Sequence, residues 1–484
     1  RRSRGAAAHL DSTSRSLAIT PRRRRDSWRT DLSPKYERSV SGDLAHSWLG
    51  SGKSASAVRE NHQSCPPSST ADSRTPTPIT TTTTGRPRKD RRGGAGSDRA
   101  THTHTNRMTT TTTAGNASAG GEKSLGKAHV PYGDDGKGHY TLATKGCFDV
   151  IENATALCVE ALRGVPLPPA SQPLQISDYG TADGGTSMPL ISALIREVRA
   201  REPAREVLVA YEDQPNNDFK SLFFYVQGLQ SVGRAGYSQT YLKEFPEGVF
   251  VQCSGTSFHE QCFPTGSVHF GMSFTAMHWL SEKPCDITTG VHMTQAQGQE
   301  KDAFARVAAK DWSHLLQLRS KELAVGGKMV IVNFCVDAQG YYLGKTDKPV
   351  CMYDTFDKHW RAMRDEGKIT QEEYAGGTLL NYYRNDQEMK HPFQEGEAVH
   401  ASGLRLVSCE SKITRCPYNE EYRRAVAAGE PVDDRAAAKG IIGTMRTWSN
   451  SSFLTALSGS RPAAERQALV DELYQRYEDE IAQD

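Results

Sequence analysis

The order of apolar segments in this chain predicts an α/β fold built on a mostly parallel sheet. Strand-like segments alternate with amphipathic helical segments from about residue 138 onward, which is typical of β-α-β units. Residues 328–336 (Lys-Met-Val-Ile-Val-Asn-Phe-Cys-Val) are almost continuously apolar, as expected of a parallel strand that helices cover on both faces.

The first half of this fold is predicted from the spacing of apolar residues. Apolar or small side chains recur at helical spacing over residues 141–163, and the prolines at 166, 168 and 169 end that helix. A glycine-rich turn over 180–185 leads into a second helix over 187–200. We expect four strands in this half, over residues 174–178, 206–211, 249–254 and 267–273.

The second half begins with a long amphipathic helix over residues 302–323, with its apolar residues near one face. We expect Gly326-Gly327 to cap this helix before the strand 328–336 begins. Helical patterns then predict an inserted α-helical cap around residues 345–400. The remaining elements are a strand pair from 404–408 and part of 411–414, and a charged terminal helix over 463–481.

Residues 1–127 differ from the rest of the chain. They are rich in Ser, Thr, Arg, Gly and Pro and carry an excess of basic side chains, which predicts a disordered basic segment before one domain over 128–484. Met108 is the first methionine and a candidate start, in which case residues 1–107 are not native. An organelle transit peptide is the alternative. A nucleic-acid-binding tail is disfavoured because few aromatic residues accompany the basic runs.

Composition excludes several classes of protein. None of the ten cysteines forms a Cys-x-x-Cys pair, so we expect neither a disulfide framework nor a metal site. No apolar run of about 18 residues exists that could span a membrane. We therefore expect a cytoplasmic protein with no nucleic-acid or membrane partner, unless the N-terminal segment directs it to an organelle.

The glycine-rich turn indicates a nucleotide-like ligand. It runs from Asp178 to Ser187 and contains neither the Gly-x-Gly-x-x-Gly dinucleotide fingerprint nor the Gly-Lys-Ser/Thr ending of a phosphate-binding loop, which favours a cofactor without a triphosphate. Asp213 follows the next strand, where an acid can accept hydrogen bonds from ribose hydroxyls. The structural alternative is that these acids only cap helices.

Several separated segments, in the same order, resemble the SABATH family of carboxyl methyltransferases over about residues 138–484. The matching segments are Gly138-His139-Tyr140 with Thr144, the turn 178–187, Asp213–Phe219, Ser257-Phe258 with Phe263-Pro264, His269-Phe270 with His278-Trp279-Leu280-Ser281, and Arg319–Leu323 with Gly326–Met329. The resemblance implies a class I, Rossmann-like methyltransferase fold with a helical cap over the acceptor site. It also implies S-adenosylmethionine (SAM) as the co-substrate.

The resemblance further implies which residues surround SAM. Tyr140 and Thr144 would lie at its methionine end, and Asp213 would hold the ribose. Phe258 would stack on the adenine. The other expected cofactor-binding residues are Asp178, Gly180, Thr181 and Thr186 around the methionine part, with Gln214 and Ser257 near the adenine.

The acceptor side is implied in the same way, against the alternative that its residues belong to an ordinary core. His278 and Trp279 would face the acceptor carboxylate as the candidate catalytic residues, and Trp279 offers an indole N–H donor. Met352 and Tyr353 would come from the helical cap.

Three positions depart from the family pattern. Cys147 stands where the family has the Gln that hydrogen-bonds the acceptor carboxylate, Thr275 replaces a Tyr, and Thr186 replaces an Asn. Cys147 and Thr275 would line the acceptor pocket, so the acceptor itself is left open.

The resulting functional prediction is methyl transfer from SAM to a small carboxylic acid, which gives a methyl ester. A carboxyl group ordinarily has a pKa of about 4 and is ionised at neutral pH, so it needs no general base. One alternative is methylation of sulfur in a thioether acid of the 4-methylthio-2-hydroxybutyrate type, as in dimethylsulfoniopropionate synthesis. Others are a non-catalytic SAM- or nucleotide-binding protein and an NAD(P)-dependent oxidoreductase, which the missing fingerprint disfavours. A need for Mg²⁺ is left open, and a homodimer would fit the resemblance.

Overall fold

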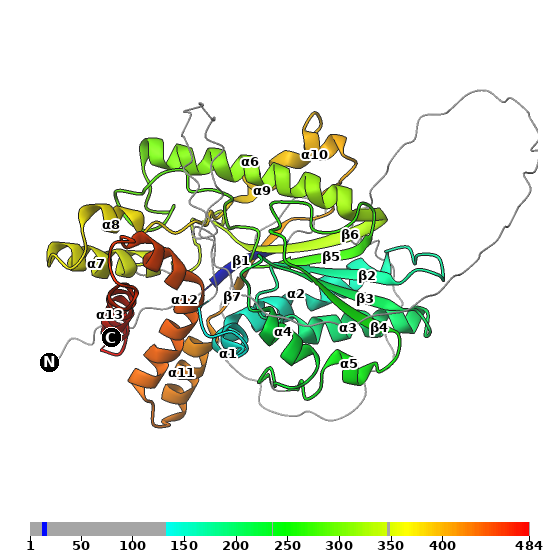
Figure 1. Ribbon diagram of the computed structural model, residues 1–484, viewed down its shortest axis with the longest axis horizontal. Coiled ribbons are helices and arrows are strands. Elements are labelled where there is room, and N and C mark those ends of the chain that lie inside the picture. The colour runs from blue at the N-terminus through cyan, green and yellow to red at the C-terminus, as the bar shows by residue number, and fades with distance from the viewer. Residues whose placement is uncertain (1–11, 17–131, 235, 346–348, 484) are drawn as a thin grey trace, which may run out of the picture. The chain divides into compact units, whose positions relative to one another are not determined.

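The computed structural model describes residues 12–16, 132–234, 236–345 and 349–483, all of which belong to one compact unit of the chain. A seven-stranded sheet of order β4-β3-β2-β5-β6-β1-β7 forms its centre (Figure 1). The strands are β1 (Ser12–Ser16), β2 (Leu174–Tyr179), β3 (Val207–Glu212), β4 (Val249–Ser254), β5 (Val268–Phe274), β6 (Leu323–Phe334) and β7 (Glu410–Thr414). The strands from β4 to β6 pair in parallel, which confirms the predicted α/β fold with a mostly parallel sheet.

Helices cover both faces of this sheet because strand side chains alternate between two cores. Ile176 of β2 packs into one core with the helices α2 and α3, whereas Tyr179 of the same strand packs into another with α6. Figure 1 shows α6 on one side of the sheet and α2 and α3 on the other. The bounds of these helices are Lys145–Arg163 for α2, Met188–Arg201 for α3 and Gly298–Glu322 for α6. The shorter helices α4 (Phe219–Val226) and α5 (Tyr241–Glu244) lie on the side of α2 and α3.

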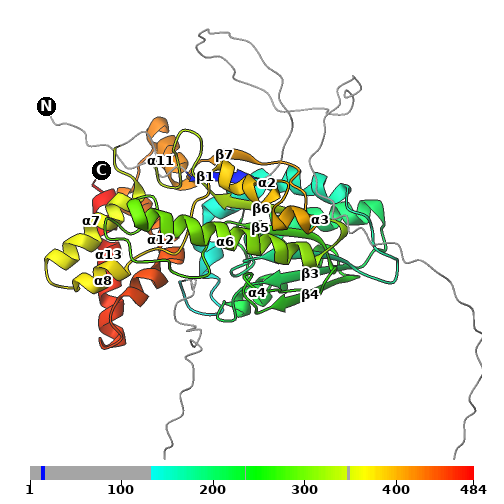
Figure 2. The ribbon, with the colours of Figure 1, turned by 90° about the horizontal axis from the view of Figure 1, so that it is seen from above.

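A second helical layer lies beside the sheet and has its own core. It contains α7 (Met352–Asp365), α8 (Gln371–Gly376), α12 (Asp434–Ala456) and α13 (Ala463–Ile481), which gather at one end of the unit in both views (Figures 1 and 2). The other short helices are α1 (His139–Ala143), α9 (Asp386–Lys390), η2 (His391–Phe393), α10 (Ala398–Ala401) and α11 (Pro417–Ala428). The predicted helices around 350–400 and the terminal helix over 463–481 are therefore confirmed. The described residues include no helix long and apolar enough to cross a membrane.

Three predicted details were wrong. The helix predicted over 141–163 is divided at Thr144, whose φ of −110° and ψ of 59° are not helical and whose hydroxyl donates to the Tyr140 carbonyl at 2.6 Å. Gly326-Gly327 does not cap α6, because Leu323 turns directly into extended backbone and both glycines lie within β6. A Cβ on Gly327 would lie 2.9 Å from the Val268 carbonyl oxygen, so the glycine permits close strand pairing there.

The third error concerns the last strand pair. Residues 404–408 are not a strand, and β7 pairs with β1, whose five residues lie in the segment that was expected to be disordered. The rest of residues 1–127, including Met108, lies outside the described residues, so the predictions about that segment stay predictions.

Candidate cofactor and acceptor sites

The chain reverses its direction across the sheet at β2, and the predicted site residues follow the strands at that point. From β2 the chain builds β3 and β4 on one side, and then β5 and β6 on the other. Ligands of open α/β sheets bind outside the carboxyl ends of the strands at such a switch point. The turn 178–187 follows β2, Asp213 follows β3, and residues 275–279 follow β5. The topology therefore brings together the three segments that the sequence singled out.

The glycine-rich turn passes very close to the loop after β5. Gly180 has a φ of +71°, and a Cβ there would lie 2.3 Å from the Ala276 Cβ, so only glycine fits. Ala182 also has a positive φ, of 51°, which is unusual for a residue with a side chain. Its N–H donates to Asp213 Oδ2 at 2.7 Å, and its carbonyl accepts from Asn217 Nδ2 at 2.6 Å. These two hydrogen bonds fix the glycine-rich turn against the residues that follow β3.

Two acids of the turn hydrogen-bond to neighbouring residues within the protein. Asp178 accepts from the hydroxyls of Thr181 at 3.1 Å and Ser187 at 2.6 Å. Asp183 accepts from both the backbone N–H and the hydroxyl of Thr141. Burial raises the pKa of each carboxyl to about 6, although these hydrogen bonds oppose the rise. Both acids therefore position the turn, whether or not they also contact a ligand.

Asp213 and Glu212 add two further carboxyl groups at the same place. Asp213 accepts from the N–H groups of Ala182 and Gln214, both at 2.7 Å, and burial raises its pKa to about 6. Glu212 accepts from the Gly180 N–H at 3.1 Å, and burial raises its pKa well above the usual value. Its Oε1 atom is buried and has no hydrogen-bond partner among the described residues. Such a cluster of acids favours a cationic ligand that also donates hydrogen bonds.

Ser257 and Phe258 lie in the loop after β4, and this loop brings Phe258 next to Gly180 of the glycine-rich turn. The Phe258 ring is 8% exposed, and its Cε1 atom lies 3.7 Å from where a Gly180 Cβ would be. Ser257 is half-buried and accepts from the His259 N–H at 3.4 Å. Gln214, at the end of β3, is half-buried as well. The predicted adenine-side residues therefore flank the turn, while Thr186 is buried at its far end.

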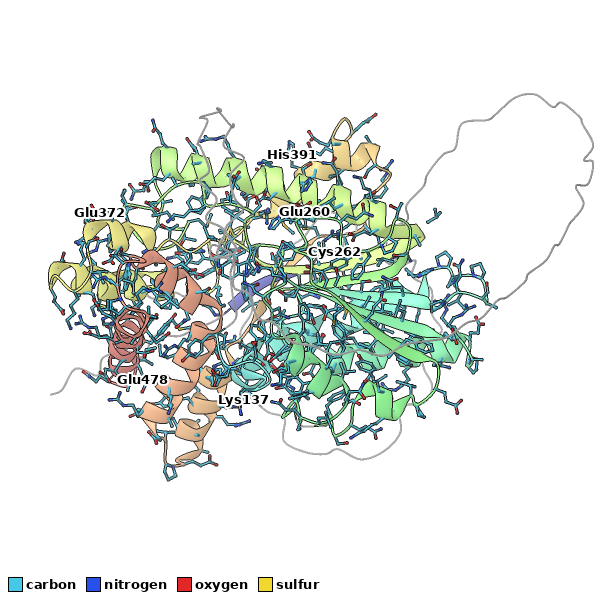
Figure 3. The ribbon with its side chains drawn as sticks, viewed as in Figure 1. Lys137, Glu260, Cys262, Glu372, His391 and Glu478 are labelled. Carbon is cyan, nitrogen blue, oxygen red and sulfur yellow. The ribbon has the colours of Figure 1, made fainter. Side chains whose placement is uncertain are left out.

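A buried ion pair fixes this loop. Arg319 and Glu322 of α6 are paired at 2.9 Å, with side chains only 1% and 0% exposed. The Arg319 guanidinium donates to the Phe258 carbonyl at 3.1 Å and to the Glu260 carbonyl at 2.8 Å. Figure 3 labels Glu260 and Cys262 between the sheet and α6. Glu322 in turn accepts from the Cys262 N–H and from the Tyr179 hydroxyl, both at 2.6 Å, so the pair ties the loop to the end of β2.

Two of the three positions that depart from the family pattern, Cys147 and Thr275, lie together with Tyr140. The Tyr140 hydroxyl and the Cys147 thiol are 3.4 Å apart. Burial raises the pKa of both groups, and a hydrogen bond with the Thr275 side chain partly offsets each rise. Thr275 itself has a positive φ, of 51°, at the end of β5. Tyr140, Cys147 and Thr275 thus form one polar group, whereas the Thr144 hydroxyl is used within its own turn.

His278 and Trp279 are held by a segment that comes from the helical layer. The Tyr382 N–H donates to the His278 carbonyl at 2.9 Å, and the Leu280 N–H donates to the Leu380 carbonyl at 2.8 Å. Trp279 and Asn381 form an isolated antiparallel bridge between these two bonds. The His278 ring is 2% exposed, whereas Trp279 is half-buried.

Three aromatic side chains lie around His278, those of Trp279, Phe334 and Tyr383, and the sequence reasoning missed the last two. The ring of Phe334, at the end of β6, lies 5.1 Å from His278, and the ring of Tyr383 lies 5.7 Å from it, edge-on. Tyr383 shares a 2.5 Å hydrogen bond with the hydroxyl of Tyr353, which the sequence did predict here. Met352 is buried beside it, and its carbonyl accepts from Tyr477 at 3.0 Å. The sequence signal that could have identified Tyr383 is the pair Tyr382-Tyr383, which lies in a segment without helical periodicity.

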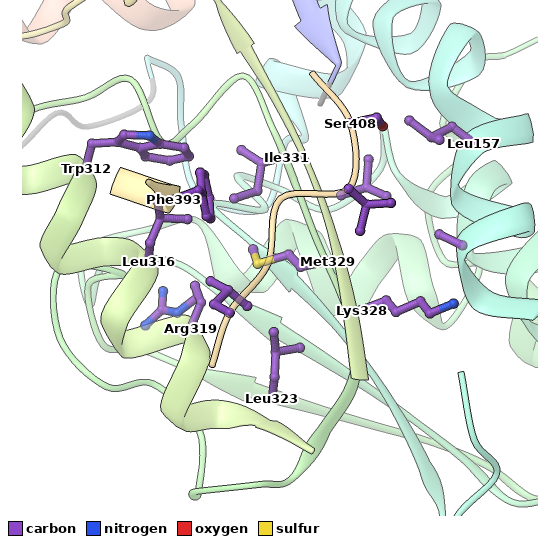
Figure 4. Close-up of a pocket in the computed structure, with 14 residues that line it drawn as sticks. Leu157, Trp312, Leu316, Arg319, Leu323, Lys328, Met329, Ile331, Phe393 and Ser408 are labelled. Atoms are coloured by element: carbon purple, nitrogen blue, oxygen red, sulfur yellow. The ribbon is translucent and has the colours of Figure 1, made fainter. Parts of the chain in front are cut away.

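Two pockets lie elsewhere and contain none of the predicted site residues. One is lined by residues of α6, β6 and 404–408, including Trp312, Arg319 and Met329 (Figure 4). The other, of about 720 Å³, lies between α6 and residues 382–397. Within the described ranges there is no group of three or more His, Cys, Asp or Glu side chains arranged to hold a metal ion.

Several known proteins are similar to this chain in sequence. Gibberellic acid methyltransferase 2 of Arabidopsis thaliana is 25% identical over 252 residues, which cover 48% of this chain and 62% of that protein. Loganic acid O-methyltransferase of Catharanthus roseus is 26% identical over 226 residues, or 42% of this chain and 56% of that protein. The chain thus spans about three fifths of the length of these curated relatives.

A solved structure, loganic acid methyltransferase with SAH, has a TM-score of 0.54 and 19% identity, and the likeness covers 72% of this chain and 91% of that chain. It shows a shared fold and confirms the predicted methyltransferase architecture. Residues 129–484 also match the family model described as SAM dependent carboxyl methyltransferase. That match covers well over half of the chain, so the chain belongs to the family of SAM-dependent carboxyl methyltransferases.

Proposed function

We propose that this protein transfers the methyl group of SAM to a carboxylate oxygen of a small acid and releases a methyl ester and S-adenosylhomocysteine. The observation that carries the proposal is the position of an acid cluster in which Asp178 and Glu212 are buried and Asp213 is half-buried. Asp178, Glu212 and Asp213 lie at the carboxyl ends of β2 and β3, and the His278-Trp279 segment follows the neighbouring strand β5. A cationic co-substrate and a carboxylate acceptor would therefore meet at the same edge of the sheet.

On the cofactor side, different residues contact the ribose, the adenine and the methionine part of SAM. Asp213 accepts hydrogen bonds from the ribose hydroxyls, and Phe258 stacks on the adenine beside Gln214 and Ser257. Gly180, whose missing side chain leaves backbone within reach, lies along the methionine part with Thr181, Thr186 and Asp178. Tyr140 and Thr144 close the methionine end. The negative charge of this cluster favours the sulfonium form over the neutral product, so it also promotes exchange after transfer.

The acceptor side is formed by residues after β5 and by the helical layer. The Trp279 indole N–H donates to one carboxylate oxygen, and His278 supports its position from the buried side. Cys147 and Thr275 border the same space, where the smaller Cys147 side chain leaves more room than a Gln would. Tyr353 and Met352 form the opposite wall.

Methyl transfer is an in-line displacement. A lone pair of the carboxylate oxygen forms the new bond to the methyl carbon, while the electron pair of the breaking carbon–sulfur bond goes to sulfur and neutralises its charge. The acceptor is already ionised at neutral pH, so no proton needs to be removed. The chain contributes by aligning the two reactants, an effect that can supply about 7–11 kcal/mol, and by excluding water.

Localisation, partners and domain organisation are also proposals. We place the protein in the cytoplasm, with a small-molecule acceptor and no nucleic-acid partner, and a homodimer stays a prediction from the family resemblance. The basic segment 1–127 and the cap around 345–400 also stay predictions as domain assignments.

A transfer screen tests the proposed function. The full chain would be incubated with methyl-labelled SAM and a panel of small carboxylic acids that includes thioether acids. A neutral labelled product from one of these acids supports carboxyl methylation. A cationic labelled product from a thioether acid would mean sulfur methylation instead. SAM binding without transfer to any acid would favour a binding protein.

A further inference from the structure

The backbone around Trp279 is anchored to two other parts of the protein. Residues 278–280 pair with residues 380–382, which come from the helical layer. Two positions after Trp279, the Ser281 N–H and hydroxyl donate to the Asp311 carboxylate of α6 at 2.8 and 2.7 Å. These contacts fix the short segment on which the proposed carboxylate donor lies.

The Trp279 carbonyl accepts a hydrogen bond from His259, which lies in the loop after β4. The His259 side chain bonds to the Trp279 backbone, whose N–H already donates to the Ala276 carbonyl at 3.1 Å, so the carbonyl is the acceptor. His259 Nδ1 is buried and has no hydrogen-bond partner among the described residues, so Nε2 is the donor. Burial lowers the pKa of His259 to about 4, which leaves the ring neutral at neutral pH with its proton on Nε2.

His259 is itself held in place by its neighbours. Its N–H donates to Ser257 Oγ at 3.4 Å, and its carbonyl accepts from Nε2 of His314 on α6 at 3.1 Å. Its ring lies against the Phe258 ring, with 4.8 Å between the centroids. The Arg319 guanidinium, also on α6, donates to the Phe258 carbonyl at 3.1 Å. His259 is therefore a fixed point from which the Trp279 backbone can be held.

The direction of the Trp279 indole depends on such support. Trp279 is half-buried, so fewer packing contacts restrain its ring than restrain a core residue. Its carbonyl carbon and its side chain share the Cα atom, so a shift of the carbonyl also moves the indole. A functional group has to be held within about 0.5 Å of its productive position. A displacement of about 1 Å, caused by a change away from the reacting atoms, can lower a rate about 100-fold.

We propose that His259 is a positioning residue for methyl transfer, because its Nε2–H holds the Trp279 carbonyl and so keeps the indole N–H directed at the acceptor carboxylate. The proposal rests on the proposed function, since it takes Trp279 as the carboxylate donor. His259 directly follows Phe258, the residue proposed to stack on the adenine. The same loop thus joins the cofactor half of the site to the acceptor half.

Two substitutions of His259 separate the hydrogen bond from the packing. His259→Leu keeps apolar volume but removes the donor, so it should lower kcat/KM for the best acid of the transfer screen about 10- to 100-fold. His259→Gln places an amide N–H₂ near the position of Nε2, so it should restore most of that loss. His269→Leu is the matched control, because His269 is also half-buried and its ring accepts from the Gln175 N–H at 3.1 Å, at the start of β5. This control should leave kcat/KM unchanged.

A double variant tests whether His259 acts through Trp279. In a Trp279→Phe background the indole N–H is absent, so adding His259→Leu should lower kcat/KM little further. A role in the stability of the loop alone would instead give the same fold loss in both backgrounds. That result would overturn the inference, as would a His259→Leu variant with the kcat/KM of the wild type.

A measurement without turnover keeps this inference separate from the proposed function. The full chain would be labelled with 5-fluorotryptophan, and Trp279→Phe would identify the Trp279 fluorine resonance among those of the six tryptophans. We expect His259→Leu to shift or broaden this resonance, and His259→Gln to leave it close to that of the wild type. If no acid is methylated in the transfer screen, the proposed function fails, and the fluorine spectra still show whether His259 holds Trp279. An unchanged resonance in His259→Leu would overturn the inference.

Discussion

Glu322→Gln should weaken both the fold and SAM binding, although Glu322 contacts neither proposed reactant. Its carboxylate is fully buried, is paired with Arg319 at 2.9 Å, and accepts hydrogen bonds from Tyr179 and Cys262, both at 2.6 Å. Removing one partner of a buried pair leaves the other charge uncompensated and typically costs about 3–5 kcal/mol. Gln also presents an amide N–H₂ where the native carboxylate accepts only. We therefore expect the free energy of unfolding to fall by about 3–5 kcal/mol.

Urea denaturation with linear extrapolation would measure this loss, and titration calorimetry would measure SAM affinity. SAM affinity should fall because the Arg319 guanidinium no longer holds the carbonyl of Phe258 in place. Glu282→Gln is the matched control, since Glu282 is an exposed partner of Lys310 at 3.3 Å and such pairs contribute little.

A double variant isolates the pair. Arg319→Met with Glu322→Leu removes both charges, and apolar replacements of a buried pair are often tolerated. The loss of unfolding free energy in the double variant should therefore be smaller than the sum of the losses in Arg319→Met and Glu322→Leu, each measured alone. A loss below about 1 kcal/mol in Glu322→Gln, or strict additivity in the double variant, would refute the role assigned to this pair.

Three other predictions follow from the site. The pKa of Asp178, Asp183 and Asp213 is raised to about 6 in the folded protein, above the ordinary aspartate value of 3.8, so their contribution to stability is present at low pH and is lost as pH rises from about 4 to 6. SAM affinity should change in the opposite direction and increase as pH rises through about 6, where the acids of the folded protein ionise; calorimetry at pH 5 and 7.5 with equal affinities would contradict this. Asp213→Ala should weaken SAM binding about 10- to 100-fold, since hydrogen bonds to a charged acceptor contribute about 1.5–3 kcal/mol, and unchanged affinity would remove Asp213 from the ribose role. Cys147→Gln should shift the acceptor profile toward simple aromatic or aliphatic acids in a transfer assay, and an unchanged profile would place Cys147 outside the acceptor space.

The cofactor half of the site was predictable because its signals are local. The turn after β2 and the acid after β3 each follow a strand whose apolar pattern is clear, and parallel strands bring their carboxyl ends to one edge. The hydrogen bond from the Ala182 N–H to the Asp213 carboxylate shows that these two local signals meet in space. The roles of the individual residues rested on the family resemblance and remain proposals.

The acceptor half was less predictable because its residues come from distant segments. Tyr383 and Asn381 lie in a stretch without clear periodicity. Backbone hydrogen bonds between Leu280 and Leu380 and between Tyr382 and His278, which are 100 or more positions apart, bring this stretch to the residues after β5. The predicted partner of the last strand was wrong for the same reason. Partners of β7 were sought nearby in residues 404–408, whereas its pairing strand is Ser12–Ser16 at the other end of the chain. Local patterns cannot specify which of two distant segments completes a sheet.

The most direct test of the central claim is to identify the atom that carries the transferred methyl group. Wild-type protein and Trp279→Phe, which keeps an aromatic ring but lacks the N–H donor, would be given methyl-labelled SAM and the best acid from the screen, and the product would be treated with hydroxide. We expect that base releases the label as methanol, as an ester requires, and that the variant forms this product much more slowly without losing SAM affinity. A label that resists base, or equal rates in the two proteins, would contradict carboxyl methylation at Trp279.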